Sequence, residues 1–205
     1  MTILAFEFSS ARRSVALAQN GKVLAEAVQH TESRATNAFA LIEKVLADAN
    51  ISRDEINTLA MGLGPGSYTG IRAALALAQG WHLAKDVKLL GVSSVAALAF
   101  QAQTEKIFGD VNVLVDAQRG EFYRATWAIS ENKFQEIGPL KIISAAEIKS
   151  AGEICVGPEQ TQKLFPRAME IAVLANQKPF VTEDFLEPIY LRATTFVKAV
   201  PSREL

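Results

Sequence analysis

The sequence predicts an α/β protein built from two related lobes, and three observations support this prediction. The same order of elements, three strands, a helix, a strand and a helix, is expected in the first half of the chain and again in the second half. A polar stretch at residues 101–110 separates the two series. With 205 residues, 49% of them hydrophobic and 21% charged, the chain can bury the cores of two small domains. We therefore expect one lobe at residues 1–105 and a second at residues 106–205.

The first half is expected to begin with three strands, the second and third of which form a hairpin. Asn20 and Gly21 both tolerate positive φ and supply the tight turn of this hairpin. A helix follows at residues 35–49, where apolar residues recur at helical spacing. A second helix is expected at residues 73–83, which are rich in Ala and Leu. The apolar segments expected to form strands are residues 2–8, 14–18, 22–28, 59–61 and 88–92.

A glycine-rich string joins the strand at residues 59–61 to the helix at residues 73–83. It reads Gly-Leu-Gly-Pro-Gly-Ser-Tyr-Thr-Gly-Ile-Arg over residues 62–72, and either Ser67 or Thr69 can cap the helix. The string has two interpretations. It forms a tight strand-to-helix turn, or it forms a cradle whose free N–H groups bind an anion.

The well-known phosphate-binding loops do not match this string. A P-loop has a Lys directly after its last glycine, and no Lys occurs between Val45 and Ala84. A dinucleotide site needs an acid at the end of the next strand, where this chain has serines. Gly64 and Gly66 are therefore only weak candidates for contact with a cofactor.

The second half is expected to repeat the same order of elements. Ser144 and Glu147 form a capping box that opens a short helix, and Pro158 suits the first turn of another helix. Residues 188–192 are mostly apolar, so we expect them to return to the fold as a strand or a helix. The expected strands are residues 111–116, 121–129, 133–137 and 153–157.

Charge and cysteine content exclude several classes of protein. The formal net charge is −1, so the chain has no general positive field to attract nucleic acid or an acidic membrane. The single Cys155 cannot form an internal disulfide and is expected to be an inert thiol of the core. The N-terminus has no basic leader, and no apolar run reaches the roughly 20 residues of a membrane span. We therefore expect a cytoplasmic protein that does not enter the membrane.

Two strings of the sequence are specific to one family. Residues 64–72, which form most of the glycine-rich string, resemble the signature of the TsaB family of tRNA threonylcarbamoyladenosine synthesis. Residues 116–123, Asp-Ala-Gln-Arg-Gly-Glu-Phe-Tyr, resemble the second signature of that family. Weaker matches occur at residues 91–94 and 188–192, so the resemblance covers nearly the whole chain.

The repeated order of elements suggests the actin-like ATPase fold, also called the ASKHA or ribonuclease H-like fold, and the TsaB family is similar to that superfamily. In this fold the first strand of each lobe ends at a cleft, which places Glu7 and Asp116 there. With Gly64 and Gly66 they are the candidates for binding ATP or ADP, at the cleft or at the interface of a complex. Alternatively, each acid is only a turn residue or a helix partner. The family usually has Asp where this chain has Glu7, which favours a cleft without activity.

Catalytic residues and metal ligands are not expected in this chain. TsaD, the catalytic relative of TsaB, resembles a metal-dependent enzyme whose helix supplies two nearby histidines. This chain has only two histidines, His30 and His82, which are far apart in the sequence. The Gly-x-Ser-x-Gly motif of serine hydrolases does not occur. We therefore expect no catalytic residue, no metal and no cofactor that belongs to this chain alone.

The helix at residues 71–81 is apolar on nearly all sides, with small residues throughout. Such a helix has to be covered all round, either by loops of the same chain or by a partner. The resemblance implies that the first two helices pack on TsaD or on a second copy of the chain. The candidate interface residues carried over on this basis are Phe39, Ile42, Ala74, Ala78, Trp81 and His82.

Arg72 is a further candidate for the interface. It lies in the first turn of a helix, where a cation opposes the helix dipole, so its position needs a reason. Three explanations are open. Arg72 pairs with Glu7 or Asp116, contacts a carboxylate or phosphate of a partner, or is simply solvated.

The resemblance implies a non-catalytic scaffold that binds and activates TsaD. TsaD would transfer threonylcarbamoyl from threonylcarbamoyl-AMP to the adenosine next to the anticodon of ANN-decoding tRNAs. The complex would include the ATPase TsaE, tRNA would bind only through the complex, and the chain alone would form a homodimer. Two alternatives are an independent ATPase or small-molecule kinase of the same fold, and a self-associating module without a role in tRNA modification.

Overall fold

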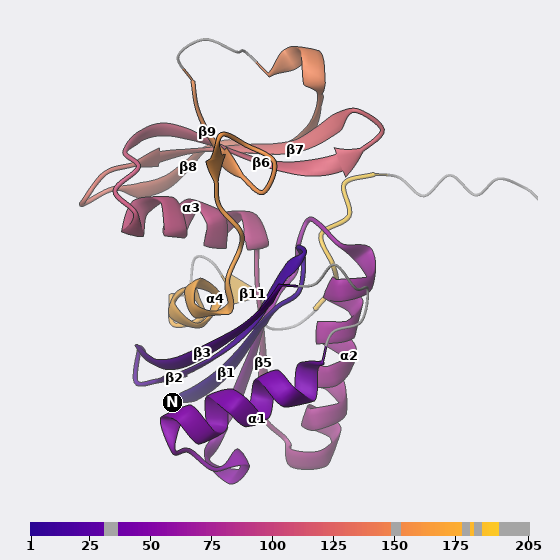
Figure 1. The fold of residues 1–205 in the computed structure, drawn as a ribbon, viewed down its shortest axis with the longest axis vertical. Helices are drawn as coiled ribbons and strands as arrows, with labels where there is room; N and C mark the ends of the chain where they lie inside the picture. Colours follow the sequence, from indigo (N-terminus) through magenta and orange to yellow (C-terminus); the bar gives the residue numbers. More distant parts are fainter. Residues whose placement is uncertain (31–36, 149–152, 178–180, 183–185, 193–205) are drawn as a thin grey trace, which may run out of the picture.

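Two β-sheets form the framework of the computed structural model, which describes residues 1–30, 37–148, 153–177, 181–182 and 186–192 (Figure 1). The strand order is β11-β5-β4-β1-β2-β3 in the first sheet and β10-β9-β6-β7-β8 in the second. The strands of the first sheet are β1 (Thr2–Glu7), β2 (Arg12–Gln19), β3 (Lys22–His30), β4 (Thr58–Gly62), β5 (Lys88–Val92) and β11 (Val181–Thr182). Those of the second are β6 (Gly109–Gln118), β7 (Glu121–Ile129), β8 (Phe134–Ser144), β9 (Ile154–Gly157) and β10 (Gln162–Lys163).

The helices of the described residues are distributed unevenly between the two halves of the chain. The first half contains long helices, whereas the second half contains one short α-helix and a single 3₁₀ turn. The α-helices are α1 (Ala38–Ala49), α2 (Tyr68–Lys85), α3 (Ser94–Thr104) and α4 (Ala168–Leu174), and the 3₁₀ turns are η1 (Arg53–Glu55) and η2 (Ala145–Glu147).

The two sheets repeat one pattern of strand pairing. In each sheet the first strand pairs antiparallel with the second, β1 with β2 and β6 with β7. It also pairs parallel with the fourth, β1 with β4 and β6 with β9. The predicted α/β architecture of two related, actin-like lobes is therefore confirmed. The division at residue 105 stays a prediction, and β11, late in the chain, pairs with β5 of the first sheet.

Several local signals have the predicted geometry. Asn20 and Gly21 have φ angles of 51° and 81° in the turn between β2 and β3. Ser67 is the N-cap of α2, and its side chain accepts a hydrogen bond from Gly70 N at 3.3 Å. The helix therefore begins earlier than predicted, because this cap draws Gly70 into the first turn.

The helix expected after Pro158 is absent. Gln160 N and Leu164 N both donate to Gly157 O, each at 3.2 Å, so the chain turns around this carbonyl. Gln162 then pairs with β9 as the start of β10. The proline therefore lies in a turn, and the next helix of the described residues is α4.

Three smaller differences concern the ends of elements. The capping box of Ser144 and Glu147 forms, but it supports only the 3₁₀ turn η2. Residues 186–192 run without a helix or a strand. The predicted helix start at residue 35 lies outside the described residues, and α1 is described from its N-cap Asn37.

Helices pack on both faces of the first sheet (Figure 1). α1 and α2 cover one face, where they share a buried cluster that includes Phe6, Val45 and Leu59. α3 and α4 lie between the two sheets, in a second cluster that includes Trp127 and Ile171. Among the described residues, no helix is both long and apolar enough to cross a lipid bilayer.

A buried hydrogen-bond network connects the end of β1, the glycine-rich loop and the start of α3. Glu7 is fully buried, and its carboxylate accepts hydrogen bonds from Ser9 N and Ser94 Oγ, both at 2.7 Å. Ser94 Oγ also accepts from Gly64 N at 3.1 Å, and Ser94 N donates to Gly64 O at 2.9 Å. A side chain at Gly62 would collide with the Glu7 carboxylate. Burial raises the pKa of Glu7, and the hydrogen bonds from Ser9 and Ser94 oppose this rise.

Substitution of Glu7 tests how far the fold depends on this network. Glu7→Ala leaves two buried donors without their acceptor, so we expect the free energy of unfolding to fall by about 3 kcal/mol. Glu7→Gln keeps the length of the side chain and one acceptor oxygen, so we expect a loss of only about 1 kcal/mol. Urea unfolding followed by circular dichroism measures both values. Equal losses in the two variants would contradict a structural role for these hydrogen bonds.

Candidate functional site

The glycine-rich loop packs directly against the end of β1. Gly66 has a φ angle of 151°, and a Cβ atom there would collide with Ser9 O. A Cβ atom on Gly70, in the first turn of α2, would collide with Phe8 O. The backbone of the chain itself therefore requires glycine at these two positions.

The N–H groups of this loop donate to atoms of the same chain. Gly64 N donates to Ser94 Oγ at 3.1 Å, and Ser67 N donates to Ser9 O at 2.6 Å. Gly70 N donates to the Ser67 side chain. A phosphate cradle needs such groups to point at the ligand instead. Of the two interpretations of the string, the strand-to-helix turn therefore fits the geometry better.

A cleft of about 550 Å³ lies where β1 and β6 end, as expected for this architecture. Residues from both sheets line it, among them Arg13 of β2 and Tyr123 of β7, together with Ser9, Tyr68 and Glu159 from the segments around them. Of the four candidate cofactor residues, Gly66 and Asp116 also line the cleft. The other two, Glu7 and Gly64, belong to the buried network described above.

Two carboxylates and one guanidinium face this cleft. Asp116 accepts hydrogen bonds from the backbone N–H and the side-chain amide of Gln118, at 2.7 and 2.6 Å. Burial raises the pKa of Glu159, and the negative charge of Asp116 adds to the rise. Arg13 supplies the positive charge of the lining. In the part of the chain that the structure describes, no group of three or more His, Cys, Asp and Glu side chains could hold a metal ion.

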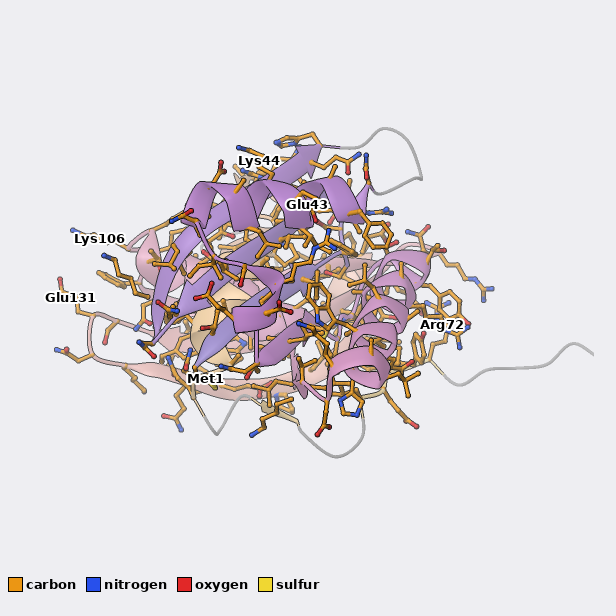
Figure 2. The ribbon with its side chains drawn as sticks, turned by 90° about the horizontal axis from the view of Figure 1, so that it is seen from below. Met1, Glu43, Lys44, Arg72, Lys106 and Glu131 are labelled. Carbon is orange, nitrogen blue, oxygen red and sulfur yellow. The ribbon has the colours of Figure 1, made fainter. Side chains whose placement is uncertain are left out.

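A second hollow, which we name the α1–α2 groove, is lined by α1, η1 and α2, the elements that cover one face of the first sheet. Figure 2 shows α1, with Glu43 labelled, and α2 in front of that sheet. Its volume is about 750 Å³. Phe39 at its edge is 71% exposed, and Leu83 on α2 is 86% exposed. The groove is lined by Phe39, Ile42 and Glu43 of α1, by Arg53 and Asp54 of η1, and by Ala76, Leu77, Gly80, Trp81, Ala84 and Lys85 of α2.

The charged residues at the edge of the α1–α2 groove pair with one another. Arg53 forms an ion pair with Glu43, and Lys85 forms an ion pair with Asp54. Exposed pairs of this kind add little stability, but they leave the floor of the groove to apolar side chains. A polar rim around an apolar centre is typical of surfaces that bind other proteins.

The structure divides the predicted interface residues into two groups. Phe39, Ile42 and Trp81 line the α1–α2 groove. Ala74 and Ala78 lie on the inner side of α2, where both are fully buried, so the prediction that they form an outward surface is wrong. The sequence could not show this, because a helix that is apolar on all sides has no preferred face. The small residues that line the groove instead are Ala76, Gly80 and Ala84.

Arg72 and His82 both interact within the chain. The Arg72 guanidinium lies 4.5 Å from the centre of the Tyr68 ring. This cation–π contact, rather than an ion pair with a carboxylate of the cleft, accounts for its position at the start of α2. His82 Nδ1 lies 2.7 Å from Val87 O, just beyond the end of α2, and His82 lines a separate hollow. Neither residue is part of the α1–α2 groove.

Sequence comparisons identify a family and several relatives of this chain. The profile of TsaD, described as tRNA N6-adenosine threonylcarbamoyltransferase, matches residues 18–191. The tRNA threonylcarbamoyladenosine biosynthesis protein TsaB of Escherichia coli K12 is 27% identical over 231 aligned positions, which cover all of both chains. TsaB of Haemophilus influenzae is also 27% identical, over all of this chain and 99% of that protein.

A solved structure from Pseudomonas aeruginosa has the same fold. It is an uncharacterized protein with similarity to the peptidase YeaZ, and it superposes with a TM-score of 0.79 at 24% sequence identity. The superposition covers 93% of this chain and 99% of that one. The chain therefore belongs to the TsaD family, and its full-length relatives place it with the TsaB (YeaZ) members of that family.

Proposed function

We propose that this chain is a non-catalytic partner of TsaD in the synthesis of threonylcarbamoyladenosine in tRNA. Its full-length relatives are biosynthesis proteins of this modification, and the family profile that it matches is that of the transferase. TsaD transfers threonylcarbamoyl from threonylcarbamoyl-AMP to the adenosine next to the anticodon of ANN-decoding tRNAs, and this chain binds and activates TsaD. The observation that carries the proposal is the α1–α2 groove.

The α1–α2 groove has the properties of a helix-docking surface. Ala76, Gly80 and Ala84 are spaced one helical turn apart, so a helix of a partner can approach α2 closely. Phe39 and Leu83 are large apolar side chains that lie mostly in water. Covering each of them contributes about 1.5–3 kcal/mol to association.

The same groove can take a second copy of this chain when TsaD is absent, since one helical face can serve both partners. In this proposal TsaE and tRNA join through the complex. The net charge of −1 supports binding of tRNA through the complex, because this chain by itself lacks the positive field that tight binding of tRNA requires. A cytoplasmic location is in keeping with a partner in tRNA modification.

The hydrogen bonds and charges at the cleft support a non-catalytic role for this chain. The glycine-rich loop uses N–H groups for internal hydrogen bonds, and Glu7 is enclosed in the buried network. Asp116 and Glu159 line the cleft, and their carboxylates would repel the phosphates of a nucleotide bound there.

Charged substitutions test the α1–α2 groove. Ala76→Arg and Gly80→Arg are expected to fold, because both positions are exposed and no atom lies within 4 Å of a Cβ on Gly80. A guanidinium in the apolar floor is expected to weaken binding to TsaD by at least about 30-fold. With TsaD, TsaE, threonylcarbamoyl-AMP and tRNA, we expect modification to drop to the level seen without this chain. Calorimetry measures the binding, and mass spectrometry of digested tRNA measures the modification.

Ala146→Arg is the matched control, because Ala146 is exposed on η2 beside the second sheet. It makes the same chemical change outside the groove, and we expect full binding and full modification. Normal modification by the groove variants, or in the absence of this chain, would contradict the proposed function.

Self-association is expected to depend on the same groove. Gly80→Arg should convert the homodimer into a monomer, whereas Ala146→Arg should stay dimeric. Size-exclusion chromatography with light scattering measures the mass of each variant. A dimer that persists in Gly80→Arg would show that self-association and TsaD binding use different surfaces.

The chain alone is expected to bind Mg-ATP with a dissociation constant weaker than about 1 mM. The physical reason is the internal pairing of the loop and the two carboxylates of the cleft. Calorimetry with the purified chain and a phosphate-release assay test this expectation. Micromolar binding with turnover would instead favour the alternative of an independent ATPase or small-molecule kinase.

A further inference from the structure

The contact between α3 and α4 connects the two sheets, because α3 packs on β6, β7 and β9 and α4 packs on β1, β2, β3 and β4. We call this contact the α3–α4 junction. Residues 186–192, which we name the strap, make a further connection at a different place. Figure 1 shows the strap in yellow, to the right of α3 and α4 and beside the upper end of α2.

The start of the strap is bound to the first sheet and to the glycine-rich loop. Ile189 N donates to Leu63 O at 2.9 Å. The side chain of Leu186 packs over Gly91 of β5, so closely that a Cβ atom on this glycine would lie 2.9 Å from Leu186 Cδ2. One backbone hydrogen bond and one apolar contact therefore hold this end of the strap.

The strap also contacts a wall of the cleft in the first lobe. The ring of Tyr190 lies against the ring of Tyr68, with 5.5 Å between the ring centres and 31° between the planes. Aromatic rings attract each other at such distances. Tyr68 is the first residue of α2 and lines the cleft. The strap therefore packs on one side of the mouth of the cleft.

Arg192 connects the other end of the strap to the second sheet. Its Nη2 atom donates to Ala117 O of β6 at 3.0 Å and to Glu121 Oε2 of β7 at 2.5 Å. Both hydrogen bonds are charge-assisted, because the donor is a guanidinium. Ala117 lines the cleft from the second lobe. The strap therefore joins one wall of the cleft to the other, Tyr68 to Ala117.

The attachment to the second sheet depends on a partly solvated group. The side chains of Arg192 and Glu121 are 34% and 41% exposed. Water and salt compete with an ion pair at this exposure. Residues 186–192 form neither a helix nor a strand, so no ladder of backbone hydrogen bonds secures them. A small perturbation can therefore detach this end of the strap.

We propose that the strap is a releasable clasp that sets the opening of the cleft. While Arg192 is bound to Ala117 and Glu121, the two lobes are held at the separation that gives the cleft its volume of about 550 Å³. When Arg192 dissociates, the second sheet is free to turn about the α3–α4 junction, and the cleft widens. The clasp belongs to the chain alone and does not depend on binding to TsaD.

The test measures the distance between the lobes by double electron–electron resonance. Spin labels are placed at Ala47→Cys in α1 and Glu131→Cys between β7 and β8, both exposed positions. Cys155→Ala removes the native thiol, and an excess of unlabelled chain suppresses signals between copies. In Arg192→Ala we expect a longer and broader distance distribution, with the population of open molecules raised at least about 10-fold by the loss of the charge-assisted bonds. An unchanged distribution would overturn the proposal.

Salt gives a second measurement on the same labelled proteins. About 1 M NaCl screens an exposed ion pair, so we expect it to lengthen the distance in the chain that keeps Arg192. In Arg192→Ala the pair is already absent, and salt should change little. An equal response to salt in both proteins would contradict the clasp. If Arg192→Ala does not fold, Glu121→Gln replaces it in both measurements, with a smaller opening expected because Ala117 O remains an acceptor.

Three matched variants make the result specific. Arg53→Ala removes another exposed arginine–glutamate pair, but one within the first lobe, so the distance should stay as in the unchanged chain. Tyr190→Ala removes the ring on Tyr68 and should open the cleft, whereas Tyr190→Phe keeps the ring and should not. Opening in Arg53→Ala, or the same distance in both Tyr190 variants, would count against the strap as the clasp.

Discussion

The contact between the end of β1 and the glycine-rich loop is the constraint on which the rest of the structure depends. Glu7, Gly64 and Ser94 belong to three separate segments, and the hydrogen bonds among them hold the end of β1, the glycine-rich loop and the start of α3 together. From this point α2 runs along the outer face of the first sheet and α3 runs toward the second sheet (Figure 1). The close approach is feasible only because Gly66 and Gly70 have no side chain.

This constraint also bears on what the cleft can do. The backbone groups that could hold a phosphate are paired with Ser9, Ser67 and Ser94 of the same chain. A cleft of the actin-like kind is retained, but its acids are Asp116 and Glu159 rather than Glu7. The outer face of α1 and α2 is a different kind of surface, because its apolar side chains have no cover within the described residues.

The two faces of the first sheet therefore have different roles in our interpretation. The α1–α2 groove presents Phe39 and a row of small residues to a partner. The opposite face holds the α3–α4 junction, where Glu170 and Gln101 are buried polar groups in an otherwise apolar cluster.

The sequence by itself determined most strands and their sequence along the chain, the hairpin at Asn20-Gly21, Ser67 as one of two candidate caps, and the family. These features depend on residues that are close together in the chain, so their signals are local. Only the tertiary structure decided that Ala74 and Ala78 face inward, since α2 is apolar on all sides. It likewise decided that Glu7 is a buried acceptor, because its partner Ser94 is 87 residues away in the chain. Such contacts join distant segments, and no local pattern of residues encodes them.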